Sequence, residues 1–471
     1  MNATSTKPLS LLAYFLRALL LMFPLGLSAC QTYQPKPLDL DATKSAWLAR
    51  SPEEQSIKDF AKFLADQNAS QYSTAYPLPI FDPSDGISLH EGEVIALVYN
   101  PDLHLTRLEA GRTHATMKYA GLWQDPTFGL DLERIISSLD GADPWVVGST
   151  IGITIPISGR LAAEKSTATA QHSAQLDHIA ASEWATQAAL RQQWINWSAS
   201  LLEAQVNSEL VASLRDIVSL VDKQQAAGTL SRIDARIFHV ELAARQADMI
   251  ELEARIKQHE LEIRALMGLS ADKLITLHPA LSFSPRASDS NQVLASLEQS
   301  HPELNAIRAE YEVSEHELRT QIRAQYPDIT LAPGYGSDQG DSRVLLGLSL
   351  PIPLWNRNQQ AIAQASAQRE LAKGRFDTTY QRLTAKLAQA LVGYQAGKAQ
   401  REWIESTLIP MVVQQESDLR KSAAIGRVEP LIMLEAIKTQ QAARIRLIYA
   451  RKLESQGGIR LDELIGPVLC P

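Results

Sequence analysis

The sequence has no long uninterrupted apolar run after its N-terminal leader, which ends at Cys30. A helix needs about 20 apolar residues to cross a bilayer, and no stretch of that length follows Cys30. This absence excludes a transporter built from α-helical membrane spans. The chain also has no basic stripe that could neutralise phosphate groups, so a nucleic-acid partner is not expected.

Aromatic residues and cysteines are scarce as well. Aromatics make up 6% of the 471 residues, whereas Ala, Gln, Leu and Glu fill long tracts. That composition is typical of extended helices. The two cysteines lie near the two ends of the chain, and we interpret the second, Cys470, as an inert thiol without an intrachain partner.

Residue constellations that carry chemistry are missing. No Ser/His/Asp arrangement and no pair of catalytic carboxylates can be placed, so we predict neither enzymatic activity nor a bound cofactor. The ten histidines include no pair at the i, i+4 spacing of helical zinc ligands, and even His172 and His178 are further apart. Without a supporting cysteine they do not resemble zinc ligands. We interpret them as residues of helix surfaces and predict no metal site.

Residues 1–29 are predicted to be a lipoprotein signal peptide. Lys7 and Arg17 give it positive charge, and an apolar core ends in LSAC at Leu27–Cys30. LSAC resembles the lipobox of bacterial lipoproteins, which implies cleavage before Cys30 and acylation of its thiol. Gln31 is not the aspartate that often retains such proteins at the inner membrane, so we expect the outer membrane. The alternative is an ordinary signal peptide with an incidental cysteine.

What the chain does contain is a long internal repeat. NPDL at Asn100 corresponds to HPEL at His301, and ITIPISGR ending at Arg160 corresponds to LPIPLWNR ending at Arg357. Repeats of this size indicate a duplicated architecture rather than a solenoid. The predicted domains are the signal peptide (1–29), an N-terminal anchor and lead-in (30–87), a first repeat (88–268), a connector (269–299), a second repeat (300–457) and a C-terminal tail (458–471).

Within each repeat the apolar period changes from 3.6 to 2 after a helix. The helices are predicted from Asn100 to about Leu122 and from His301 to about Gln325. The alternating apolar residues that follow are Phe128, Leu130, Leu132, Ile151, Ile153 and Ile155 in the first copy, and Ile329, Leu331, Val344, Leu346, Leu348 and Leu350 in the second. Each copy therefore predicts a β-hairpin, with turns rich in Gly and Asp at 137–144 and 336–341.

Two long helical tracts follow the hairpins, at 159–227 and 357–425. Each would be about 100 Å long as a continuous helix, and their heptad-like apolar spacing favours coiled-coil packing. Pro410 predicts a kink or a break late in the second tract. Each tract ends at a glycine, Gly228 or Gly426, after which a return helix is expected.

The four strands suit a transmembrane β-barrel, which is apolar outside and polar inside. Four strands cannot close a barrel, since the smallest have about eight, and an open edge is too costly in hydrocarbon. We therefore predict a mainly α fold with a membrane β-barrel part: long coiled-coil helices and four strands per chain, with three copies forming a helical tunnel and a twelve-stranded barrel. The alternative, a soluble β-sandwich, does not explain the long helices between the strands.

These segments resemble the TolC family of outer-membrane efflux proteins. The resemblance rests on NPDL at Asn100, AGLWQDPTFGLDL at Ala120, HPEL at His301 and LSLPIPLWNRNQQAIAQA at Leu348, and it covers about residues 88–457. It implies a homotrimer whose tunnel crosses the periplasm to an adaptor protein and an inner-membrane pump. PIPLWNRNQ resembles the CzcC-like heavy-metal branch, although Gln360 stands where members of that branch often have Gly.

The resemblance also implies which residues meet the partner. Gly228 and Gly426 would lie at hairpin tips that form the periplasmic mouth, and a structural capping role for them is compatible with this position. The neighbouring residues that would touch the adaptor are Thr229, Leu230 and Ser231 at the first tip, and Arg427, Val428 and Glu429 at the second.

Three carboxylates lie close in sequence to the second tip: Asp418, Glu429 and Glu435. In a trimer each would become a ring of three carboxylates, which favours cations at the mouth. The alternative is a solvated helix face whose basic partners are Arg420, Lys421 and Arg427.

The sequence thus predicts a passive exit duct of a tripartite efflux pump, anchored to outer-membrane lipid through Cys30 and extending into the periplasm. The pump is expected to be of the resistance-nodulation-division type, and heavy-metal cations are one candidate substrate. Two alternatives stay open, namely a duct for type I protein secretion and a structural periplasmic coiled-coil lipoprotein.

Overall fold

The computed structural model describes residues 32–71, 81–134, 136, 145–338, 341–424 and 430–467. It divides into two units, residues 1–49 and 50–471. The first unit contributes helix α2 (Leu40–Ala49), none of whose residues is buried. Cys30 and Cys470 lie outside the described residues. Across the described part of the chain, no helix combines the length and the apolar character needed to cross a membrane.

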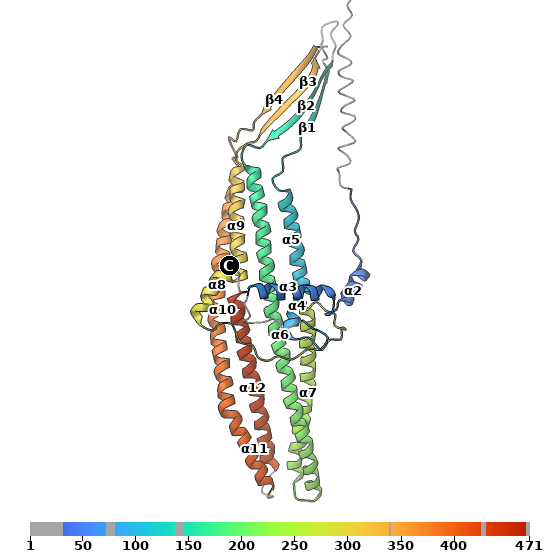
Figure 1. Ribbon diagram of the computed structural model, residues 1–471, viewed down its shortest axis with the longest axis vertical. Helices are drawn as coiled ribbons and strands as arrows, with labels where there is room; N and C mark the ends of the chain where they lie inside the picture. Colours follow the sequence, from blue (N-terminus) through green and yellow to red (C-terminus); the bar gives the residue numbers. More distant parts are fainter. Residues whose placement is uncertain are drawn as a thin grey trace, which may run out of the picture. The chain divides into compact units, whose positions relative to one another are not determined.

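The second unit contains the same order of elements twice, which confirms the duplication (Figure 1). A lead-in helix α3 (Gln55–Gln71) comes first. The first copy consists of α4 (Leu89–Tyr99), α5 (Pro101–Tyr119), β1 (Thr127–Arg134), β2 (Trp145–Ile155), α6 (Arg160–Ala226) and α7 (Arg232–Leu266). The second copy consists of α8 (Ser290–Ser300), α9 (Pro302–Arg323), β3 (Ile329–Asp338), β4 (Asp341–Ser349), α10 (Gln359–Trp403), the π-helical turn η1 (Ile404–Leu408), α11 (Ile409–Ala424) and α12 (Pro430–Ile465).

Local sequence sets the helix starts of the first copy. Ser88 and Glu91 form a complete capping box at the start of α4. Asn100 then caps α5 by accepting hydrogen bonds from the N–H groups of Asp102 and Leu103. Ser51 and Glu54 have the spacing of a second capping box, which predicts a helix start at Pro52; that prediction is wrong, because the Glu54 carboxylate accepts a hydrogen bond from the Tyr99 hydroxyl instead. Helix α3 therefore begins only after Glu54.

The four strands form one antiparallel sheet in the order β1-β2-β3-β4. The registers place nearly all the alternating apolar residues on one face. That face carries Phe128, Leu130 and Leu132 of β1, Val147, Ile151 and Ile153 of β2, Leu331, Pro333 and Tyr335 of β3, and Val344, Leu346 and Leu348 of β4. The opposite face carries mainly Gly, Thr, Asp and Glu. The second hairpin turn is shorter than predicted, because β3 continues to Asp338.

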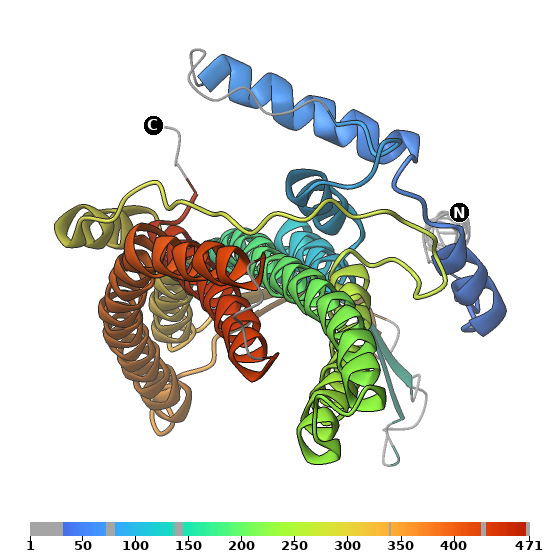
Figure 2. The same cartoon turned by 90° about the horizontal axis from the view of Figure 1, so that it is seen from below.

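Helix α6 is the central element of the helical part. It packs against α4, α5, α7, α9 and α12, and its predicted apolar seam is buried at Leu190, Trp194 and Trp197. The return helices pair with the long helices, α7 with α6 and α12 with α10 (Figure 2). The sheet lies at one end of these helices, and the connection that follows α6 lies at the other, together with the end of α11 (Figure 1).

A buried ionic cluster joins the two copies near the middle of α6. Arg191 of α6 binds Glu93 of α4 and lies 2.9 Å from Asp462 of α12. Arg286, in the segment that connects the copies, binds the other oxygen of Asp462 at 2.6 Å. Both guanidinium groups also stack on the Trp184 ring, at 5.5 Å from its centroid. We call Glu93, Arg191, Arg286 and Asp462 the Arg191 cluster.

The last helix extends beyond the predicted second repeat. Residues 458–465, which the sequence analysis assigns to a C-terminal tail, form the final turns of α12. Ile459, Leu461 and Leu464 are buried there. Leu461 and Leu464 pack in the same core cluster as Leu383 and Leu387 of α10. This apolar contact explains why the helix does not end at Gly457.

His301 departs from the interpretation of the histidines as surface residues. It stands before Pro302 as Asn100 stands before Pro101, but its side chain makes no capping hydrogen bond. The side chain is buried, with 5% exposure, and its Nδ1 finds no partner among the described groups. Burial lowers the pKa of His301 to about 4, because a charged imidazole is poorly solvated there.

We expect His301→Asn to remove an acid sensitivity of the fold. As the pH falls from about 6.5 towards 4, the unfolded chain binds a proton at His301 before the folded chain does, so the free energy of unfolding decreases. Asparagine can supply the cap seen in the first copy and does not titrate. The unfolding temperature should decrease less between pH 7 and pH 5 in His301→Asn than in the wild type. Equal losses would contradict the assignment, and His239→Asn, at an exposed position, is the control.

Candidate functional site

The end of the helices opposite the sheet contains the predicted partner-binding residues of the first tip, Gly228 to Ser231. At the first tip, Gly228 adopts φ +75, a left-handed conformation that suits glycine. Its N–H donates to the Gln225 carbonyl, and the N–H of Thr229 donates to the Gln224 carbonyl. These two bonds are those of a Schellman motif, which satisfies the last carbonyls of α6. The capping role inferred for Gly228 is therefore confirmed.

The residues after Gly228 begin the return helix. Ser231 is the N-cap of α7, and its hydroxyl oxygen accepts a hydrogen bond from the Asp234 N–H at 3.1 Å. Leu230 packs on a core cluster that includes Val221 of α6, Phe238 of α7 and Leu434 of α12. The first tip is thus tied both to its own helix pair and to the return helix of the second copy.

The second tip can be described only up to its flanks. Helix α11 ends at Ala424 and α12 begins at Pro430. Gly426, Arg427, Val428 and Glu429 lie outside the described residues, so their predicted contacts stay predictions.

The interruption predicted at Pro410 is a π-helical turn directly before it. Proline has no N–H, and its ring clashes with the carbonyl four residues earlier. Over Ile404–Leu408 the chain accordingly adopts π geometry, and the Ile409 N–H donates to the carbonyl of Ile404. Helix α6 of the first copy has no such turn over its 67 residues. The second long tract therefore has a break in its α-helical hydrogen-bond pattern that the first lacks.

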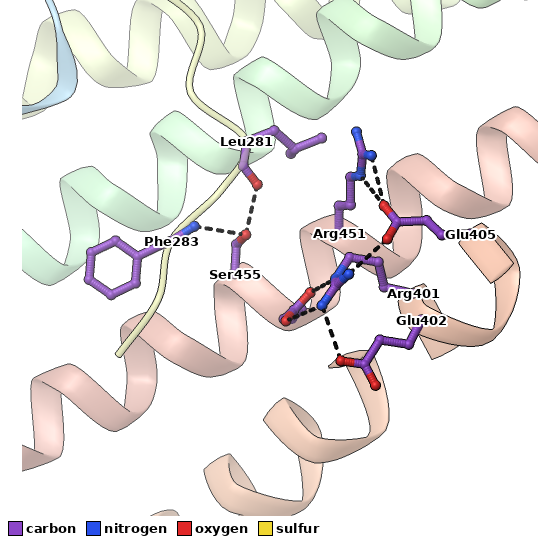
Figure 3. Close-up of polar contacts among 8 residues, drawn as sticks. Leu281, Phe283, Arg401, Glu402, Glu405, Arg451 and Ser455 are labelled. Atoms are coloured by element: carbon purple, nitrogen blue, oxygen red, sulfur yellow. Dashed lines mark hydrogen bonds and ion pairs between the residues drawn. The ribbon is translucent and has the colours of Figure 1, made fainter. Parts of the chain in front are cut away.

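An ionic network joins this π-turn to α12 (Figure 3). Glu405 of η1 accepts hydrogen bonds from Arg401 of α10 and Arg451 of α12, both at 2.8 Å. Arg401 also binds Glu454 of α12. The hydrogen bond from Arg451 is the main reason that the pKa of Glu405 is lowered, and Arg401 adds to the effect. We call Arg401, Glu405, Arg451 and Glu454 the Glu405 network.

Close helix packing fixes α10 against α12 just before the π-turn. A Cβ added to Gly397 would lie 2.5 Å from the Glu454 nitrogen, and one added to Gly457 would lie 2.7 Å from backbone atoms of Tyr394. Ser455, next to Glu454 on α12, binds the segment that connects the copies: its hydroxyl donates to the Leu281 carbonyl and accepts from the Phe283 N–H (Figure 3). Just before the π-turn, α10 and α12 are thus tightly packed against each other.

The predicted mouth carboxylates lie on exposed helix faces. Asp418 of α11 accepts hydrogen bonds from Gln414 and lies 3.6 Å from Lys421. Glu435 is exposed on α12. A groove of about 520 Å³ runs between α6 and the α11–α12 pair, lined in part by Glu209, Glu416 and Arg444. Within the described ranges, no three His, Cys, Asp or Glu side chains converge as they do in a metal site with three or more protein ligands.

Sequence reasoning did not find the Glu405 network. Its residues on α12 lie 46 to 53 residues along the chain from the partners that they bind on α10 and η1, so no local spacing indicates these contacts. The one available signal is the pair Arg401 and Glu405, which stand at the i, i+4 spacing on one helix face.

Comparisons with known proteins place this geometry in context. A family model described as outer membrane efflux protein matches residues 94–269 and 293–467, more than half of the chain. The cobalt-zinc-cadmium resistance protein CzcC of Cupriavidus metallidurans is 25% identical over 283 residues, which cover 59% of this chain and 68% of that protein.

Solved structures share the fold at low sequence identity. A structure of CusC superposes with a TM-score of 0.66 at 16% identity and covers 84% of this chain and 96% of its own. The outer membrane protein VceC of Vibrio cholerae gives 0.66 at 16% identity, with 80% and 96% covered. The outer-membrane channel OprN gives 0.68 at 15% identity, with 93% and 98% covered.

We expect Gly228→Ala to destabilise the first tip and Gly228→Asn to do so less. The space around Gly228 is open, so the cost is that of the left-handed backbone, about 1 kcal/mol for alanine and less for asparagine. Amide hydrogen exchange over residues 224–231 measures the free energy of local opening. Exchange in Gly228→Ala that is as slow as in the wild type would contradict the Schellman assignment.

The Glu405 network is expected to weaken in acid. Because the folded-state pKa of Glu405 lies below its ordinary value of about 4.3, the network stabilises the fold above that pH and loses its effect as the pH falls through the folded-state pKa. Glu405→Gln removes this part of the pH dependence of thermal unfolding. Glu402→Gln is the matched control, because Glu402 is 55% exposed and approaches Arg401 only to 3.5 Å. Equal pH dependence of both variants would refute the role of Glu405.

Proposed function

The chain belongs to the outer membrane efflux protein family, and on that premise we propose that it is the outer-membrane exit duct of a tripartite efflux pump. The observation that carries the proposal is the four-stranded sheet at one end of the long helices, with an exposed apolar face and a polar one. Phe128, Leu130 and Leu132 of β1 are 58%, 58% and 61% exposed. Such a sheet suits a barrel whose outside contacts lipid and whose inside contacts water.

The duct we propose is a homotrimer. Strands β1 and β4 are the edges of the sheet within the chain, and in a bilayer an unpaired edge leaves backbone groups without partners. Three copies join β4 of one chain to β1 of the next and close a twelve-stranded barrel. Helix α7 supports the same assembly, since Ile233, Ile237 and Val240 are 79%, 43% and 62% exposed along one face that a neighbouring copy can cover.

The partners follow from the other end of the helices. We assign the adaptor contacts to the two tips, at Gly228, Thr229, Leu230 and Ser231 and at Gly426, Arg427, Val428 and Glu429. The carboxylates Asp418 and Glu435 are assigned to the mouth, where three copies of each repel anions. An inner-membrane pump of the resistance-nodulation-division type supplies the energy, and the duct itself conducts passively.

Heavy-metal cations are the substrate we favour. The relative CzcC is described as a cobalt-zinc-cadmium resistance protein, and the chain carries an excess of acidic residues, with a formal charge of −8. The N-terminus is held in the outer membrane by lipid on Cys30, the residue that closes the LSAC motif.

Native mass and conductance test the duct directly. The detergent-purified protein should have the mass of three chains, and it should form ion-conducting pores in planar bilayers. A monomeric mass together with an absence of conductance would overturn the proposal.

The anchor has its own test in cells. Metabolic labelling with radioactive palmitate should mark the wild type and Cys470→Ala but not Cys30→Ala. Label retained in Cys30→Ala would show that another residue carries the lipid.

A further inference from the structure

Two histidines on neighbouring helices meet at a distance from the tips and the sheet. His114 lies on α5 and His172 on α6, and their ring centroids are 5.3 Å apart at an interplanar angle of 62°. They lie far apart in the sequence, with the whole first β-hairpin between them, so a search for closely spaced histidines does not find them. The contact exists because α5 and α6 pack side by side.

The hydrogen bonds around His172 fix which ring nitrogen carries the proton. The Thr113 hydroxyl donates its only hydrogen to the Ala110 carbonyl at 3.0 Å. The same oxygen lies 3.1 Å from Nδ1 of His172. Both contacts are hydrogen bonds at the same time only if this oxygen accepts from the imidazole, which makes Nδ1 the donor. In a neutral imidazole with a protonated Nδ1, the lone pair is on Nε2. Thr113, which is buried, thus holds His172 in the tautomer that leaves Nε2 free to bind a metal.

The spacing of the two rings suits a shared ion. With metal–nitrogen bonds of about 2.1 Å and a tetrahedral angle, two coordinating imidazoles have centroids about 5 Å apart, close to the separation found here. His114 is exposed and His172 is half-buried, so an ion can reach the pair from solvent. No third His, Cys, Asp or Glu joins them among the described residues, which leaves the remaining positions to water and makes the site weak.

We propose that His114 and His172 form a low-affinity site for a divalent transition-metal ion such as Zn²⁺ or Co²⁺. Imidazole nitrogen is a preferred ligand of these ions. Thr113 is a positioning residue that holds the His172 tautomer. The two histidines can bind a metal ion whether or not the protein is a duct. That the site takes part in the export of cations rests on the proposed function. A site with only two protein ligands suits transient binding during export, because it releases the ion readily.

Metal titration of the full-length protein in detergent tests the site. Co²⁺ added to the wild type should produce visible absorption bands of an imidazole-bound ion, and Zn²⁺ should displace it. His114→Ala and His172→Ala should each weaken binding at this site at least tenfold. His239→Ala is the matched control, since His239 is an exposed helix residue paired with Asp222, and it should bind as the wild type does.

The positioning role of Thr113 has its own variants. Thr113→Val should weaken Co²⁺ binding by about tenfold, as loss of such an outer hydrogen bond typically does, and Thr113→Ser should restore it. Unchanged thermal melting shows that each variant folds. Affinity within twofold of the wild type in both His114→Ala and His172→Ala would overturn the site. An unaffected Thr113→Val would overturn the tautomer argument. Neither result depends on conductance, so a failed metal site and a failed duct are distinguishable.

Discussion

The Arg191 cluster is the interaction on which the arrangement of the two copies depends. It brings together one charged side chain from each of α4, α6, α12 and the connecting segment, and its two carboxylates, Glu93 and Asp462, are buried. Buried charges are tolerated only when they are paired, and removing one partner typically costs about 3–5 kcal/mol. Because Asp462 binds an arginine from each side, the cluster sets α6 of the first copy against α12 of the second.

Because the two copies are joined near the middle of α6, the two ends of the long helices differ in structure. The sheet presents a continuous apolar face and two edges, whereas the first tip presents a capped return helix. The two copies differ mainly toward the tips, where the second has a π-turn, a proline and the Glu405 network. Gly397 and Gly457 allow α10 and α12 to pack closely just before that turn. A duplicated chain thus carries one continuous long helix and one that is interrupted by a π-turn, and we infer that the interrupted one adapts to the partner.

Much of this fold could be predicted from sequence because short-range patterns of apolar, capping and helix-breaking residues determine its elements. The change of period from 3.6 to 2, the capping residues Ser88 and Asn100, and the breaking effect of Pro410 are all short-range effects. The burial of His301, the Glu405 network and the meeting of His114 with His172 depend on which helices pack together, which one sequence does not state. The predicted start of α3 at Pro52 is wrong for the same reason, since the hydroxyl of Tyr99, the last residue of α4, donates a hydrogen bond to Glu54.

The central claim is that open strand edges of one chain are closed by other copies, and interchain cross-linking tests it most directly. In a Cys470→Ser background, Asp131→Cys on β1 is combined in turn with Arg343→Cys, Leu345→Cys and Gly347→Cys on β4, positions on the same polar face. Oxidation in membranes should yield covalent trimers and nothing larger for at least one pair, and no trimers for the single-cysteine variants. Monomers alone for every pair, or a ladder that continues past three chains, would contradict the closed trimeric barrel.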